Sequence, residues 1–198
     1  MVYTHTKELL ATPPALEPIT LAEARAHCRV PDSYTDDDTY LSGLITTARQ
    51  LLEEQCWSSF VTQAWDFWWS SFDNRMFIPR GPLIGITTFR YRLPNSPYTL
   101  TDVSEYDYEV SSEHGLWYAR LSYNATWPTS RGHYDDIYMR VSNGYGPAAA
   151  NVPTPIKHAI KLMVGDLYAN REEAAGGVSK RVESRVDSLI GPYRLLRM

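Results

Sequence analysis

The stretch VPTPIKHAIKLMVGDLYANREEA, residues 152–174, has the clearest helical periodicity in the chain. Its apolar residues recur at offsets 0, 3, 4, 7, 8, 11 and 12, on one face of a helix: Ile156, Ala159, Ile160, Met163, Val164, Leu167 and Tyr168. We expect Thr154 to cap this helix, Pro155 to occupy its first turn and Gly176-Gly177 to end it. The pattern predicts an amphipathic helix that packs against other helices.

Three further segments predict the helices that would pack against it. In ITLAEARAHCRV, a capping box formed by Thr20 and Glu23 opens a short helix. In DSYTDDDTYLSGLITTARQLLEEQCW, an apolar stripe of helical period follows three aspartates, which favour the positive end of a helix dipole. The tail VSKRVESRVDSLIGPYRLLRM permits a short helix before Gly191-Pro192.

Between these helices the pattern changes to short β-rich runs separated by turn residues. In ITTFRYRL, residues 86–93, polar and apolar side chains alternate as in a half-buried antiparallel strand. Five of the six tryptophans lie in this part of the chain, and we expect Trp65, Phe67 and Trp69 to share a buried face. Trp68 then lies on the opposite face, where an intersubunit contact is an open alternative.

The chain is therefore predicted to be an α+β protein, with an antiparallel β-region inserted between the second and third main helices of a helical bundle. Residues 1–17, which contain Pro13 and Pro14, are expected to form an extended arm. Residues 18–59 and 151–198 form the expected helical domain, and residues 60–150 form the inserted β-region.

The charge is unevenly distributed along the chain. The net charge is −4, and it divides into −5 over residues 1–59, −2 over residues 60–150 and +3 over residues 151–198. Such a gradient suits an assembling subunit whose two ends meet different partners, whereas a nucleic-acid reader would be basic overall. No apolar run approaches the length of a membrane span, and the first residues lack the features of a signal peptide, so we expect synthesis in the cytoplasm and no membrane partner.

The sequence offers no catalytic, metal-binding or cofactor-binding pattern. The two cysteines and five histidines show no ligand spacing, and there is no glycine-rich phosphate loop. We therefore expect that the protein is not an enzyme and that it binds no cofactor. Two alternatives stay open: a metal-dependent enzyme, and a DNA-binding regulatory module.

The order of the motifs resembles one family. PITLAEARAHCRV, the acidic start of the second helix, QAWDFWWSSFDNRMFIPRGPLIGITTFRY, YDYEVSSEHGLWY, VPTPIKHAIKLMVGDLYANREE and the closing LIGPYRLLR are similar, in this order, to the head–tail connector or adaptor proteins of long-tailed bacteriophages and related prophages. The resemblance spans about residues 18–197. It implies a structural virion protein at the neck that forms a ring of twelve copies between the portal protein and the tail or next neck protein. Genomic DNA would pass through this ring without being read for sequence.

The resemblance also implies interaction residues. It points to the C-terminal segment from Arg185 as the portal-binding element, with these candidates: Arg185, Leu189, Tyr193, Arg194, Leu195, Leu196 and Arg197. The alternative is a tail that packs on its own subunit. A ring needs two different complementary faces on each copy, and we expect these residues to contribute to them: Asp36, Asp37, Asp38, Trp68, Arg90 and Arg92.

Overall fold

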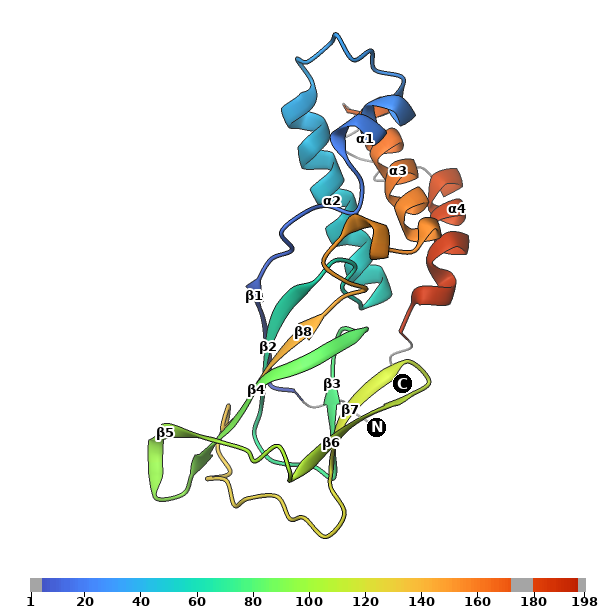
Figure 1. The fold of residues 1–198 in the computed structure, drawn as a ribbon. Helices are drawn as coiled ribbons and strands as arrows, with labels where there is room; N and C mark the ends of the chain where they lie inside the picture. The colour runs from blue at the N-terminus through green and yellow to red at the C-terminus, as the bar shows by residue number, and fades with distance from the viewer. Residues whose placement is uncertain (1–4, 172–179, 196–198) are drawn as a thin grey trace. The chain divides into compact units, whose positions relative to one another are not determined.

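The computed structural model describes residues 5–171 and 180–195, and in it the chain divides into two compact units (Figure 1). The helical unit comprises residues 14–61, 145–171 and 180–194, and the β unit comprises residues 5–13, 62–144 and 195. Helices and antiparallel sheets thus occupy separate parts of one chain, which confirms the predicted α+β class.

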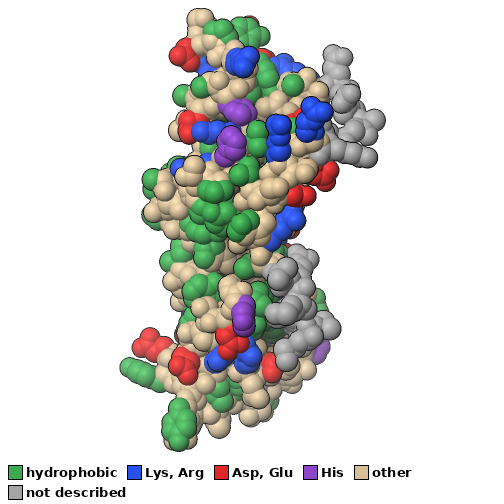
Figure 2. Space-filling model, turned by 90° about the vertical axis from the view of Figure 1, so that its right-hand side faces the viewer, with side chains coloured by type: hydrophobic (Ala, Val, Ile, Leu, Met, Phe, Trp, Pro, Cys, Tyr) green, Lys and Arg blue, Asp and Glu red, His purple; other side chains and the backbone are tan. Residues whose placement is uncertain are grey.

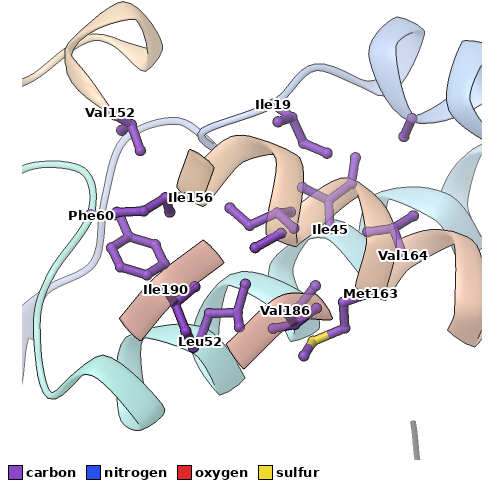
Figure 3. Close-up of a cluster of buried hydrophobic side chains, with 14 of the residues drawn as sticks. Ile19, Ile45, Leu52, Phe60, Val152, Ile156, Met163, Val164, Val186 and Ile190 are labelled. Carbon is purple, nitrogen blue, oxygen red and sulfur yellow. The ribbon is translucent and has the colours of Figure 1, made fainter. Parts of the chain in front are cut away.

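Four helices form the helical unit: α1 (Leu21–Cys28), α2 (Asp38–Cys56), α3 (Thr154–Ala169) and α4 (Lys180–Ile190). Helix α3 contacts each of the other three, as its continuous apolar face requires (Figure 1). Figure 3 shows Leu52 and Phe60 close to Ile156 and Ile190 in the shared core. Short 3-10 turns at Ala149–Asn151 and Gly191–Tyr193 flank α3 and α4.

The helix termini follow the sequence in part. The capping box of α1 is present, because the Thr20 hydroxyl accepts from the Glu23 N–H at 3.2 Å and the Glu23 carboxylate accepts from the Thr20 N–H at 2.9 Å. The expected cap of α3 is wrong. Pro153, in extended conformation, precedes the helix, and Thr154 is its first residue without a side-chain capping bond. Pro155 lies in the first turn as predicted, where a missing N–H loses no helical hydrogen bond.

Helix α3 also ends earlier than expected, at Ala169, with Asn170 as its C-cap. The side chains of Tyr168 and Arg171 turn to Asp37 instead of continuing an exposed helical face. The predicted terminator, Gly176-Gly177, lies outside the described residues.

The β unit holds two antiparallel sheets. Strands β1 (Lys7–Thr12), β2 (Gln63–Trp69), β8 (Ile137–Asn143), β4 (Leu83–Leu93) and β5 (Ser96–Asp102) form the larger sheet in this spatial order. Strands β3 (Arg75–Ile78), β7 (Leu116–Leu121) and β6 (Tyr108–Glu113) form the smaller one. A second core combines residues from both sheets, among them Phe67, Met76, Phe89, Ala119 and Met139.

The alternation predicted for β2 is confirmed. The alternation predicted for β4 is confirmed only from Phe89 onward, because a register shift between Ile86 and Thr88 places Ile86, and not Thr87, against the core. Phe67 and Trp69 are buried and Trp65 packs against the same cluster, whereas Trp68 lies on the other face of β2. In β4, Phe89 and Tyr91 are the buried residues. The two edge strands of the larger sheet were not predicted: β1 lies within the expected arm, and β5 contains Pro97, which suits only an edge strand.

Candidate interaction surfaces

Two of the three aspartates at the start of α2 are engaged inside the helical unit. Asp37 accepts hydrogen bonds from the Tyr168 hydroxyl at 2.6 Å and from the Arg171 guanidinium at 2.5 Å. These two donors hold the pKa of Asp37 below its ordinary value, with Arg171 the larger cause. Asp38 accepts from the Arg25 Nε at 2.7 Å. Asp36 is exposed, so it retains the accessibility that a contact with another copy requires.

The other three proposed intersubunit residues lie in the β unit. Trp68 is half-buried, with the Lys7 ammonium 4.6 Å from its ring and Tyr138 packed at 5.4 Å between ring centroids. The Arg90 Nε donates to Asp102 at 2.6 Å, an exposed pair across strands β4 and β5. The Arg92 N–H donates to the Asp136 carbonyl at 2.9 Å, and the Arg92 carbonyl accepts from the Arg131 N–H at 3.1 Å.

The start of the C-terminal segment packs on its own subunit. Leu189 lies against the helical core, and the Tyr193 ring meets Tyr145 with centroids 6.4 Å apart. Arg194 donates to Asp187 at 2.6 Å. Arg185 is exposed on α4. In the single copy, Leu189 and Tyr193 therefore pack on their own subunit, as the alternative to portal binding expects.

Leu195, the last described residue, lies in the β unit. A β-carbon placed on Gly81 would come within 3.2 Å of the Leu195 side chain and 3.3 Å of the Trp117 ring, so the absence of a side chain at residue 81 makes room for both. The remaining two portal-binding candidates, Leu196 and Arg197, lie outside the described residues.

A group of exposed tyrosines in the β unit was missed by the sequence analysis. Tyr98 is 94% exposed, Tyr106 82% and Tyr123 93%. Figure 2 shows hydrophobic side chains that stand out from the surface of this unit beside acidic ones. Each of the three has turn-forming residues nearby, such as Pro97, Asp107 and Asn124, and this was the available signal. Elsewhere in the β unit tyrosines such as Tyr91 and Tyr118 are buried, so residue type alone did not separate the two groups.

Two histidines adjoin on the surface of the helical unit. The His27 and His158 rings lie 6.5 Å apart, and Figure 2 shows adjoining histidine side chains there with Lys and Arg side chains near them. Partial burial lowers the pKa of His27, and the nearby His158 and Lys161 lower it further. Lys161 in turn donates to Glu23 at 2.8 Å.

Within residues 5–171 and 180–195, no group of three or more potential ligand side chains is arranged for a metal ion. Both cysteines are free thiols, and burial raises the pKa of Cys56 to about 11, which disfavours the reactive thiolate. In the same part of the chain, no helix combines the length and apolar character that a bilayer crossing requires.

Solved structures share the fold of nearly the whole chain. The chain matches a chain in "Neck of empty GTA particle computed with C6 symmetry" with a TM-score of 0.80 and 16% identity, covering 98% of this chain and 97% of that one. It matches a chain in "Virion of native gene transfer agent (GTA) particle" with a TM-score of 0.77, 17% identity and coverages of 98% and 97%. A chain in "Neck of native GTA particle computed with C12 symmetry" matches with a TM-score of 0.68, 17% identity and coverages of 96% and 97%.

About a third of the chain matches a known protein family. Residues 18–84 match the family model described as Phage gp6-like head-tail connector protein. Over these residues the match confirms the resemblance to head–tail connectors that the order of motifs indicated. No curated protein matches the chain.

Proposed function

We propose that this chain is a structural, non-enzymatic protein of the neck of a phage-like particle, where it joins the head to the tail. The observation that carries the proposal is the whole-chain likeness to a neck subunit, over 98% of this chain. The connector-family match over residues 18–84 supports the same conclusion from sequence. The protein would be made in the host cytoplasm and incorporated at the head–tail interface.

The proposed assembly is a ring of twelve copies between the portal protein and the tail or next neck protein. Two structures with this fold are of particle necks with sixfold and twelvefold symmetry. In a ring each copy uses two different faces, because the association is head-to-tail. Asp36, Trp68 and Arg90 remain candidates for such contacts, since each keeps some exposure in the single copy.

The ring would extend the DNA channel without reading sequence. The net charge of −4 supports this, because affinity for the phosphate backbone grows with the number of basic contacts. A protein with this charge offers passing DNA little general attraction.

We restrict the proposed portal-binding element to the last residues of the C-terminal segment, from Tyr193 onward. Tyr193 and Arg194 are already partnered within the helical unit. To bind the portal protein, Tyr193 and Arg194 would either give up these contacts or contact the portal while keeping them. Leu195 and the two candidates beyond the described residues, Leu196 and Arg197, complete the element.

The proposal is tested by electron microscopy of particles from a lysate that lacks this gene. DNA-filled or leaking heads beside separate, finished tails are expected, and supplying the intact gene from a plasmid should restore joined particles. Normal tailed particles in the mutant lysate would reject the neck assignment. A metal-dependent activity of the purified protein would then favour a packaging enzyme, and specific DNA binding at physiological salt would favour a regulator.

A further inference from the structure

The three exposed tyrosines lie on strand β5, on the connection that follows it and on a segment hydrogen-bonded to that connection. Tyr98 is on β5, the outermost strand of the larger sheet, and Tyr106 is in the turn that connects β5 to β6. The Ser122 N–H donates to the Asp107 carbonyl at 3.0 Å, which brings the segment bearing Tyr123 beside this turn. We call the exposed side chains of residues 98–109, together with Tyr123, the β5–β6 surface.

Tyrosine is one of the residue types enriched at protein interfaces. An aromatic ring in water forgoes the burial that makes such residues dominant at interfaces. Leu100 on β5 is 36% exposed and adds an aliphatic group to the same surface. The β5–β6 surface therefore has the composition of an interface.

The charge of this surface selects its partner. Residues 93–119 contain no lysine or arginine, and Glu105, Asp107 and Glu109 form no ion pair with any described residue. Glu105 and the Arg90–Asp102 pair also line a hollow of about 250 Å³ beside β4. Such a surface repels nucleic acid and attracts arginine or lysine side chains.

The helical unit carries a matching cationic face on α4. Val186 and Ile190 are buried in the core, which leaves Arg181 and Arg185 exposed one helical turn apart. Neither forms an ion pair with a described residue, whereas Arg194 is neutralised by Asp187.

We propose that the β5–β6 surface of one copy receives α4 of a neighbouring copy, with Arg181 and Arg185 placed against Glu105 and Glu109. This interface rests on the proposed ring and names the faces that close it. The two faces differ and lie on different units, so each copy offers one to each neighbour, as head-to-tail association requires. Arg185 is thereby assigned to the neighbouring copy instead of the portal.

A charge swap tests the pairing. The variants Glu105→Arg/Glu109→Arg and Arg181→Glu/Arg185→Glu would each be produced as the only copy of the protein, and the chain would be quantified in purified particles. Each double variant should reduce incorporation about tenfold, as expected for facing charges that become alike. The quadruple variant should restore most of the loss.

Two matched controls accompany the swap. Asp32→Arg/Asp73→Arg changes the net charge by the same amount as Glu105→Arg/Glu109→Arg, but at exposed carboxylates elsewhere. It should leave incorporation unchanged. Tyr106→Ser should lower it, whereas Tyr34→Ser, at an exposed tyrosine of the helical unit, should not. Circular dichroism melting of each purified variant separates lost assembly from lost folding.

Every outcome decides the pairing. Normal incorporation of either double variant, or a quadruple variant as defective as the double variants, overturns it. Absence of the unaltered protein from the neck of normal particles would instead reject the proposed function itself.

Discussion

The carboxylate of Asp37, immediately before α2, accepts a hydrogen bond of 2.5 Å from the guanidinium of Arg171, beyond the end of α3. The two residues are 134 positions apart in the sequence, and the Arg171 guanidinium also stacks on the Tyr168 ring at 4.4 Å. The pair joins the beginning of one helix to the end of another inside the helical unit. An aspartate that looks like a simple helix cap thus has a tertiary role.

We expect Asp37→Asn to lower the melting temperature at neutral pH and to make it less sensitive to acid. The folded-state pKa of Asp37 lies below its ordinary value of 3.8, so its stabilising contribution is complete above that pH and is lost as the pH falls further. Thermal melts of both proteins from pH 7 down to pH 2.5 would show the curves converging in acid. Parallel curves would mean that the Arg171 contact contributes nothing.

We expect Glu53→Ala to destabilise the protein by about 2 kcal/mol, because it removes one of the two carboxylates that pair with the buried Arg49 guanidinium, Glu17 being the other, and it also removes the acceptor of the Phe60 N–H. Glu53 accepts from the Arg49 Nη1 at 2.6 Å and from the Phe60 N–H at 2.8 Å. Urea unfolding followed by circular dichroism measures the loss. Gln55→Ala, an exposed change on the same helix, serves as the control and should cost at most about 0.5 kcal/mol.

Mild acid should weaken the helical unit through His27. Its pKa is lowered from 6.5, so the folded state resists protonation and loses stability as the pH falls from 6.5 through the lowered value. The groups that face it are His158 and Lys161 on α3, with Glu23 on α1 partly offsetting Lys161. His27→Gln should therefore lose less melting temperature between pH 7.5 and 5.5 than the unaltered protein. His133→Gln, in the β unit, should behave like the unaltered protein.

Deletion of residues 191–198 should abolish binding to the portal protein and leave the two cores folded. Because Tyr193 packs against Tyr145, the deletion should also lower the melting temperature slightly, and Tyr193→Ala measures that part alone. A pull-down with purified portal protein gives the binding readout. Undiminished binding by the deletion variant would remove the C-terminal segment from the portal contact.

Local sequence patterns predicted the helices and strands that bury one face in a core. The apolar face of α3 and the alternation around Phe89 could be read directly, because each records which side of the element faces a core. Strand β1 could not, since KELLAT has no alternation and its partner β2 begins more than 50 residues later. Strand β5 was hidden by Pro97 and by side chains that stay exposed.

The surfaces were harder to predict than the cores. The run Asp36-Asp37-Asp38 looks uniform in sequence, yet the fold neutralises its second and third members with Arg171 and Arg25. No local pattern encodes such pairing, because it depends on residues brought together only by folding. Exposure of Tyr106 and Tyr123 is likewise a property of the folded β unit.

The division of each unit into separate stretches has a consequence for biosynthesis. The chain passes between the units after residues 13, 61, 144 and 194, and the helical core includes Val186 and Ile190. A ribosome must therefore translate the chain past residue 190 before that core can close. Truncated products that stop before α4 would lack Val186 and Ile190 and could not complete the helical core.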